Sequence, residues 1–238
     1  MYEETGKAMQ PEYHRTAQDT WDTIAESFDT TRQKPWKYCL DFIHSLRSSD
    51  VVADLGCGNG RHLIASAEHC SQVIGLDISQ KFLQIIEKKH PDAVHNNITL
   101  LHGDVVHLPF TDQSLDAVLF IAALHNIKGK QHRQAALQEI TRVLRPQGTA
   151  LISVWSRWQD KFYRHFLKHL LIRHHEFGDI DIWWRQHNLN IPRFYHLYSK
   201  IEFTQELRKA GLKIQHIESV KIHSKRFPDN YFAVVKKA

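Results

Sequence analysis

Residues 51–60 read Val-Val-Ala-Asp-Leu-Gly-Cys-Gly-Asn-Gly, and this stretch decides the fold. An apolar run followed by three closely spaced glycines predicts a strand that turns sharply into a helix beside a bulky ligand, because glycine adopts positive φ and lets the backbone approach closely. The NAD-type fingerprint G-x-G-x-x-G has a longer gap before its last glycine than the G-x-G-x-G of Gly56, Gly58 and Gly60. Taken alone, the stretch is also compatible with an ordinary tight turn.

A second apolar run, Val73–Leu76, ends in Asp77. Doubly wound folds place an acid that binds ribose hydroxyls at about this distance from the glycines, roughly 20 residues. The third expected strand ends at Gly103 and Asp104. The simpler interpretation of Asp77 and Asp104 is that each caps the helix that follows it. The two acids together with the glycine loop favour a nucleotide-like ligand.

Expected strands and helices alternate beyond the glycine loop, which indicates a parallel sheet covered on both faces. We therefore expect a doubly wound, Rossmann-like α/β fold with a mostly parallel, seven-stranded sheet. The strands are expected at residues 51–55, 73–77, 98–102, 117–121, 149–155, 214–220 and 231–235. The helices are expected at residues 12–28, 36–46, 61–69, 80–89, 132–144 and 199–210. No strand is expected between residues 156 and 198.

The 238 residues, 42% of them hydrophobic, suffice for one domain with additions. Its parts are N-terminal helices at 12–48, a core at 50–155, a substrate-binding insertion at 156–198, and a final helix and strands at 199–238. The longest apolar stretch, Ala117–Leu124, is too short to span a membrane, and we expect a soluble, cytoplasmic protein. The three cysteines have no metal-like spacing, so neither a disulfide nor a metal site is expected.

The glycine loop, the two acids and the segment Leu108–Asp116, which follows the pattern LPF-x-D-x-S-F-D, resemble the class I S-adenosylmethionine (SAM) methyltransferases. The resemblance implies that SAM is the cofactor, that Asp77 accepts the ribose hydroxyls and that Asp104 receives the adenine amino group. The small residues Ala122 and Ala123 would lie against the cofactor. The residues expected to bind the cofactor are Asp54, Gly56, Gly58, Gly60, Asp77, Ile78, Asp104, Val105 and Ala122, with Lys34 and Trp36 closing the pocket from the N-terminal side.

The flanking sequences resemble those of the tRNA wobble-uridine carboxymethyl methyltransferases. The matching segments are Tyr13-His14, Trp21–Ala25 with Phe28, Thr31–Trp36, His125, Trp155 and Arg193–Tyr198. That family uses SAM to esterify the carboxylate of 5-carboxymethyluridine at the tRNA wobble position. One departure is Leu124-His125-Asn126-Ile127, where the family often has a His-His-Trp-like sequence.

Five residues are expected to form the catalytic part of the site. The resemblance assigns His125 and Arg32 to the substrate carboxylate, Trp155 to the pocket wall beside the methyl group, and Arg193 and Tyr195 to the nucleotide or its phosphate. A cation or a hydrogen-bond donor orients a carboxylate, and flat rings support a splayed uridine. Each residue also has a plain alternative, because tryptophans are often core residues and arginines are often solvated.

Two partners are expected. The net charge of +5 and the pI near 9.1 suit a polyanion, and the stretch from Trp155 to His175 could bind the tRNA anticodon stem. Its cations are Arg157, Lys161, Arg164, Lys168 and Arg173, and its alternative role is an amphipathic helix that packs Phe162, Phe166 and Leu170 inward. The resemblance also implies a small zinc-binding activator protein that adds a strand beside the apolar edge Ile98–Leu101.

Two further functions remain open at this stage. One is a SAM methyltransferase that acts on a small quinone or carboxylic acid, which shares the core and predicts activity without RNA. The other is a non-catalytic RNA-binding protein that kept the fold, which the intact glycines, Asp77 and Asp104 argue against.

Overall fold

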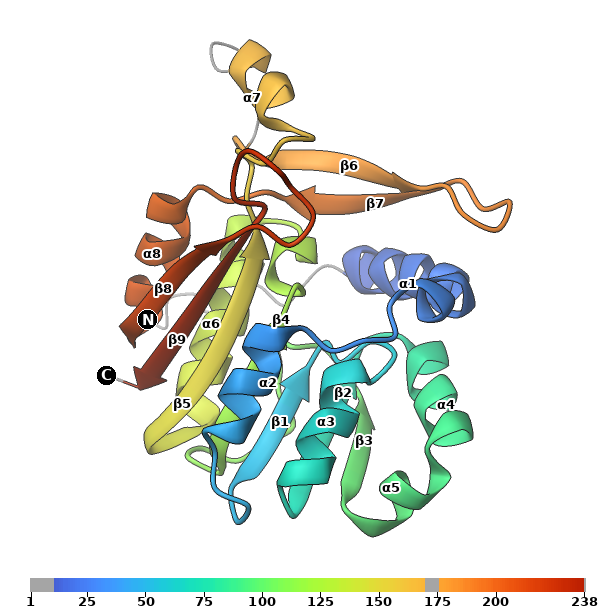
Figure 1. Cartoon of the computed structure of the whole chain (residues 1–238), viewed down its shortest axis with the longest axis vertical. Helices are drawn as coiled ribbons and strands as arrows, with labels where there is room; N and C mark the ends of the chain where they lie inside the picture. The colour runs from blue at the N-terminus through green and yellow to red at the C-terminus, as the bar shows by residue number, and fades with distance from the viewer. Residues whose placement is uncertain (1–10, 170–175, 238) are drawn as a thin grey trace, which may run out of the picture.

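A computed structural model describes residues 11–169 and 176–237, with side chains from Ala17 onward. Figure 1 shows one twisted sheet with helices on both faces and a hairpin above it. The helices are α1 (Pro11–Thr31), α2 (Lys37–His44), α3 (Arg61–His69), α4 (Gln80–Lys89), α5 (Pro91–Asn96), a 3₁₀ turn η1 (Leu124–Asn126), α6 (Lys130–Val143), α7 (Tyr163–His169) and α8 (Lys200–Lys209). The strands are β1 (Val51–Leu55), β2 (Gln72–Asp77), β3 (Ile98–His102), β4 (Leu115–Ile121), β5 (Leu144–Trp155), β6 (Asp179–Trp184), β7 (Ile191–His196), β8 (Leu212–Val220) and β9 (Asn230–Lys237).

The main sheet has seven strands in the order β3-β2-β1-β4-β5-β9-β8. The strands from β3 to β5 are parallel, whereas β9 runs antiparallel to both β5 and β8. The predicted seven-stranded, mostly parallel sheet is therefore confirmed. The strand order reverses between β1 and β4, which is where doubly wound folds bind their ligands.

Two apolar clusters hold the helices to the sheet. On one face, α6 and α8 contribute Leu137, Ile140, Phe203 and Leu207 to a buried cluster with the strands. On the other face, helices α2, α3 and α4 pack residues such as Ile43, Leu63 and Ile86 against it. Burial of both faces explains why the central strands are continuous apolar runs. No helix in the described part of the chain is long and apolar enough to cross a membrane.

The insertion contains a two-stranded hairpin that the sequence did not predict. Strands β6 and β7 pair antiparallel, and their apolar residues pack with Phe162 and Phe166 in a small separate core. Side chains alternate along β6, so that Ile182 and Trp184 are buried while Trp183 is 45% exposed. The expectation of no strand between 156 and 198 was wrong. The alternation of buried and exposed residues is short, and Pro192 argued against a strand, because proline in a sheet is confined to edge strands, strand starts and bulges. The hairpin, with α1, covers the carboxyl ends of the central strands (Figure 1).

Candidate active site

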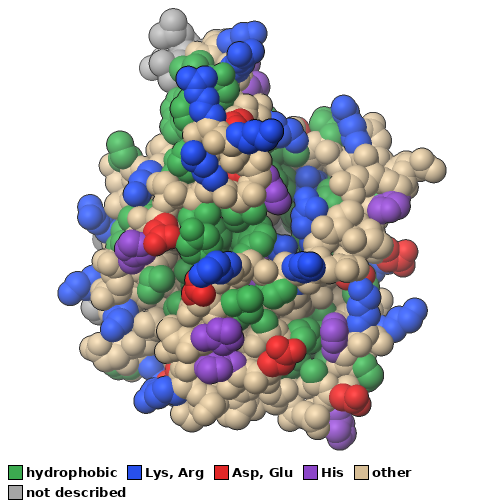
Figure 2. All heavy atoms as spheres, viewed as in Figure 1, with side chains coloured by type: hydrophobic (Ala, Val, Ile, Leu, Met, Phe, Trp, Pro, Cys, Tyr) green, Lys and Arg blue, Asp and Glu red, His purple; other side chains and the backbone are tan. Residues whose placement is uncertain are grey.

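A pocket lies at the carboxyl ends of β1, β2 and β4, beneath α1 and the β6–β7 hairpin. Its lining includes most residues that the sequence predicted for the site. These are Arg32, Trp36, Gly56, Gly58, Asp77, Ile78, Asp104, Val105, Ala122, His125, Trp155, Arg193 and Tyr195. Three predicted residues, Asp54, Gly60 and Lys34, do not line it. Figure 2 shows a hollow between the upper and lower parts of the molecule with Lys and Arg side chains at its rim.

The glycine loop forms the floor of the pocket in a conformation that requires glycine. Gly56 has φ +65°, and a Cβ there would stand 2.7 Å from the Cβ of Ala123. Gly58 has φ +54°, but a Cβ there would meet no atom within 4 Å. Open space beside a left-handed backbone is what a ligand in van der Waals contact with the loop requires. The loop is anchored by N–H donation from Gly56 and Cys57 to the carbonyl of Leu76.

Asp77 occupies the end of β2 and is held by two backbone donors. Gly58 N donates to one carboxylate oxygen at 2.7 Å, and Ser79 N donates to the other at 2.8 Å. Burial raises the pKa of Asp77 to about 6, and these two hydrogen bonds oppose the shift. The residue that caps α4 is Ser79, whose hydroxyl accepts from Phe82 N, so Asp77 is free of that role. Its remaining lone pairs can accept from a diol.

Asp104 and Asp54 also place carboxyl groups near the pocket. Asp104 lies in a turn after β3, not at the start of a helix, and accepts from Val106 N at 3.0 Å. Asp54 is buried behind the loop, and burial raises the pKa of its carboxyl to about 8. One of its oxygens has no hydrogen-bond partner. Buried acids of this kind favour a cationic ligand, since a positive charge repays their desolvation.

The other side of the pocket is a cluster of three rings, His125, Trp155 and Tyr195, whose centroids lie 5.0 to 5.5 Å from one another. Tyr195 lies parallel to His125 and to Trp155, with ring centroids 5.2 Å and 5.0 Å apart. Trp155 N donates to His125 Nδ1 at 3.1 Å, so the neutral imidazole carries its proton on Nε2. Burial lowers the pKa of His125 to about 3. His125 is therefore a neutral hydrogen-bond donor at physiological pH and not an acid or a base.

Two of the predicted residues, Arg193 and Arg32, place guanidinium groups in the lining of the same pocket. Arg193 is buried, donates to the Tyr195 hydroxyl at 2.8 Å and lies 4.9 Å from the ring of Trp184. Its Nε has no hydrogen-bond partner. Arg32, at the end of α1, donates to the carbonyl of Thr31. Within the described part of the chain no carboxylate forms an ion pair with either arginine. Burial lowers the pKa of Arg193 and Arg32 lowers it further, so an anion bound here is strongly favoured.

Sequence reasoning missed several residues of the pocket lining, Arg61 and Asn126 among them. Arg61 is the first residue of α3, and its guanidinium lies 4.6 Å from the Trp36 ring. Its position directly after the glycine loop could have revealed it, since a cation there suits an anionic group at a helix N-terminus. Asn126 lines the pocket next to His125, and Trp184 lies behind the lining, with its ring 4.9 Å from the guanidinium of Arg193. Trp184 Nε1 donates to the hydroxyl of Ser27 at 2.8 Å, which fastens the hairpin to α1. No local sequence pattern signals that contact.

The sequence prediction for Arg157 was wrong. Arg157 is 5% exposed and pairs with Glu202, so it cannot contact RNA from the surface. Lys161, Arg164 and Lys168 are exposed as expected, while Arg173 lies outside the described residues. Phe162 and Phe166 pack inward, which confirms the amphipathic packing of this segment. Leu170 lies outside the described part of the chain.

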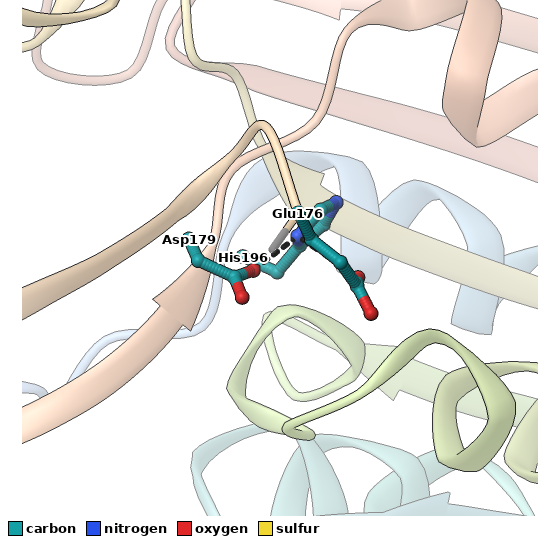
Figure 3. Close-up of side chains that lie close together, drawn as sticks. All are labelled: Glu176, Asp179 and His196. Atoms are coloured by element: carbon teal, nitrogen blue, oxygen red, sulfur yellow. Dashed lines mark hydrogen bonds and ion pairs between the residues drawn. The ribbon is translucent and has the colours of Figure 1, made fainter. Parts of the chain in front are cut away.

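A second titratable cluster lies at the base of the hairpin and holds it in place. Figure 3 shows Asp179 and His196 directed toward each other, with Glu176 beside them. His196 Nδ1 lies 2.6 Å from Asp179, and its Nε2 lies 3.1 Å from Glu202. Arg133 Nη2 lies 2.6 Å from Glu176, so a guanidinium already neutralises the carboxylate that a metal ion would need. The cluster anchors β7, the strand that carries Arg193 and Tyr195.

Residues 53–152 match the family described as a methyltransferase domain. The pocket also fits SAM: open space lies beside Gly58, carboxyl groups stand at the ends of β2 and β3, and Arg61 begins the helix after the loop. These residues would hold the amino-acid, ribose and adenine parts of the cofactor, which supplies an electrophilic methyl group. The chain thus combines a segment that matches the methyltransferase domain, the class I methyltransferase fold, and a pocket with the groups needed to bind SAM.

The particular relatives it resembles act on tRNA. It is 35% identical over 158 residues to the tRNA (carboxymethyluridine(34)-5-O)-methyltransferase ALKBH8 of Macaca fascicularis, covering 66% of this chain and 22% of that protein. It is 29% identical over 205 residues to the tRNA (carboxymethyluridine(34)-5-O)-methyltransferase of Schizosaccharomyces pombe, covering 80% of this chain and 86% of that protein. The chain spans about a fifth to a third of the length of the animal and plant relatives it matches.

A solved structure shares the fold. It is the complex between the Haloferax volcanii Trm112 methyltransferase activator and the putative methyltransferase, with a TM-score of 0.67 and 22% identity. The match covers 93% of this chain and 97% of that one. At this identity the likeness shows the fold alone.

SAM affinity is expected to rise with pH through the titration of Asp77. The ligand-free carboxyl has a pKa of about 6, and a cationic ligand favours its ionised form, so binding at lower pH releases a proton. Affinity measured by calorimetry should therefore rise between about pH 5 and about pH 7, by at most about tenfold per unit. S-adenosylhomocysteine, which lacks the sulfonium charge, should show a smaller rise. Equal rises for the two ligands would contradict this assignment.

Proposed function

We propose that the protein transfers the methyl group of SAM to the carboxylate of 5-carboxymethyluridine at the tRNA wobble position, forming the methyl ester. The observation that carries the proposal is the buried guanidinium of Arg193, which lines the pocket without a carboxylate partner among the described residues. Arg32, which is partly buried, also lines the pocket and has no carboxylate partner among the described residues. The names of the relatives support the choice of a tRNA nucleoside over other carboxylates.

The chemistry asks little of the protein beyond positioning. A carboxylic acid with a pKa near 4 is already ionised at neutral pH, so no general base is needed. This agrees with a pocket in which both histidines of the lining, His62 and His125, are buried, and burial lowers the pKa of each. Arg193 and Arg32 hold and orient the carboxylate, and the Nε2–H of His125 donates to it. Orientation of this kind is worth several kcal/mol in a bimolecular reaction.

The cluster of His125, Trp155 and Tyr195 would hold the uridine and exclude water. Tyr195 and Trp155 are already parallel, so the base needs no rearrangement of these side chains to find a flat surface. Once the ester forms, the acceptor loses its charge, and the attraction to Arg193 and Arg32 falls. Loss of this attraction favours release of the neutral product.

Acceptor choice tests this function. The protein is incubated with SAM and with tRNA carrying 5-carboxymethyluridine, its amide 5-carbamoylmethyluridine, or unmodified uridine. Methylation is expected for the carboxylate alone, because the amide is neutral and a poor nucleophile. Equal methylation of small carboxylic acids without RNA would support the small-molecule alternative instead. SAM binding with no methylation of any acceptor would favour the non-catalytic RNA-binding protein.

We also propose that β3 receives a strand from a small zinc-binding activator protein. Strand β3 is an edge of the main sheet and pairs only with β2 among the described strands. Leu100 and Leu101 on it are only partly buried. Unpaired apolar edges invite pairing with another chain, and the related archaeal structure is a complex with an activator.

Thr99→Lys is expected to weaken this association without unfolding the chain. Thr99 is exposed on β3, and a lysine on an edge strand discourages strand addition. Co-expression with the activator should raise soluble yield and SAM affinity for the natural chain and less for the variant. Thr111→Lys, which adds the same charge at an exposed position before β4, is the matched control. A natural chain that is soluble and active alone would contradict the proposal.

A further inference from the structure

Beside the pocket, α7 and the loop between β8 and β9 form one positively charged surface, which we call the basic surface. Figure 2 shows Lys and Arg side chains over α7 at the top of the molecule and over the loop below it. All six cations are exposed. They are Lys161, Arg164, Lys168, Lys221, Lys225 and Arg226.

The loop half of this surface is rigidly built. The carboxylate of Asp229 accepts hydrogen bonds from the backbone N–H groups of residues 222–224, at 2.6 to 2.9 Å. The carboxylate of Asp160, before α7, accepts from the N–H groups of residues 225–227, at 2.8 to 2.9 Å. Asp160 therefore joins the two halves. Because its backbone is fixed, the loop can present its cations with little loss of entropy on binding.

Three of the six cations of the basic surface, Lys161, Arg164 and Arg226, lie over aromatic rings. Arg226 lies 4.9 Å from the ring of Phe227, which contacts Tyr163 at 5.2 Å between centroids. Arg164 lies 5.8 Å from the ring of Tyr163. Elsewhere the structure pairs surface cations with acids, as in Lys89 with Asp29. In the described part of the chain none of the six has such an ion pair, so each remains able to bind an external anion.

The basic surface lies at the same end of the sheet as the pocket, where β5 and β8 end and β9 begins. Trp155, which lines the pocket, ends β5 and pairs with Asn230 at the start of β9. Asn230 also pairs with Val220, the last residue of β8, so the loop emerges directly beside the pocket. Ser156 N donates to the carbonyl of Asp229, which ties the two segments together.

We infer that the basic surface binds the sugar–phosphate backbone of the RNA whose nucleotide enters the pocket. This inference rests on the proposed function. Fixed lysines and arginines interleaved with aromatic rings suit successive phosphates, and they give an affinity that depends on salt and not on sequence. The loop adds half of the surface, and it lies about 50 residues along the chain from the stretch that the sequence singled out.

The test is the triple variant Lys221→Gln, Lys225→Gln and Arg226→Gln in the full chain. Affinity for tRNA, measured by fluorescence anisotropy, is expected to fall about tenfold or more at physiological salt, and the slope of log affinity against log salt to decrease by up to roughly 0.9 per lost phosphate contact. SAM affinity, measured by calorimetry, should not change, since the loop does not line the pocket. The control is Arg208→Gln, Lys209→Gln and Lys213→Gln, which removes the same charge at the end of α8 and at the start of β8, the end of that strand opposite to the loop.

An unchanged tRNA affinity and salt slope in the loop variant would overturn the inference. Loss of binding to phosphatidylserine vesicles with intact tRNA binding would overturn it in favour of a membrane surface. These outcomes are separate from a failure of the proposed function, in which the natural chain binds tRNA and does not methylate it.

Discussion

Arg193→Met is expected to lower kcat/KM for tRNA methylation by about 100-fold to 1000-fold, which corresponds to about 2.7 to 4 kcal/mol. The guanidinium is buried among Trp184 and Tyr195 without a carboxylate among the described residues, so its electrostatic effect on a bound carboxylate is poorly screened. Methionine keeps the length and the apolar contacts but cannot bind an anion. Single-turnover methylation of tRNA carrying 5-carboxymethyluridine measures the effect.

Three comparisons separate this role from a structural one. SAM affinity of Arg193→Met should remain within about twofold of the natural value, since the proposed contact is with the acceptor. Arg185→Met removes an exposed arginine from the tip of the same hairpin and should leave the rate unchanged. Arg193→Lys keeps the charge but loses the planar fork, so it should restore only part of the activity. A full rate in Arg193→Met would show that the guanidinium does not hold the substrate.

Gly58→Val is expected to abolish SAM binding, with an affinity at least about 100-fold lower, or about 2.7 kcal/mol. The backbone at Gly58 has φ +54°, and no atom lies within 4 Å of the place where a Cβ would stand. A branched side chain there would occupy the space of the cofactor. The strained backbone adds a cost in folding stability of about 1 to 2 kcal/mol. Calorimetric titration with SAM measures the first effect, and thermal unfolding measures the second.

Gly211→Val is the matched control, because it separates the effect of a strained backbone from the effect of a side chain that fills the cofactor's space. Gly211 has φ +80° and would bring its Cβ only to ordinary contact with Thr141, away from the pocket. The two variants should lose similar stability, but only Gly58→Val should lose SAM. If both bound SAM equally well, the cofactor would not lie against the loop as described.

The main sheet could be predicted from the sequence because its signals are local. Each central strand is a buried apolar run, and the run of β1 ends in a glycine loop whose spacing is itself informative. The hairpin could not be predicted in the same way. It is stabilised by packing against Phe162 and Phe166 and by a hydrogen bond from Trp184 to Ser27, which is 157 positions away. Long-range contacts of this kind leave no periodic pattern in the strands they stabilise.

The same distinction between local and long-range signals applies to the two sides of the site. The cofactor side was predicted because Gly56, Gly58 and Asp77 stand in motifs with fixed spacing. On the substrate side, the resemblance to a family pointed to Arg193, but its burial and the absence of a carboxylate partner among the described residues are visible only in the structure. The sequence could not show that Arg157, another arginine of the insertion, forms an ion pair with Glu202. Charge alone does not reveal whether a cation has a partner in the fold.

The nature of the bond formed is the most direct test of the proposed function. The protein, with and without the activator, is incubated with SAM labelled in its methyl group and with tRNA carrying 5-carboxymethyluridine, and the recovered tRNA is treated with mild alkali. A methyl ester releases the label as methanol, and this is the result that we predict. Label that stays on the RNA after alkali would show methylation at carbon or nitrogen, and it would contradict the assignment of the pocket to a carboxylate.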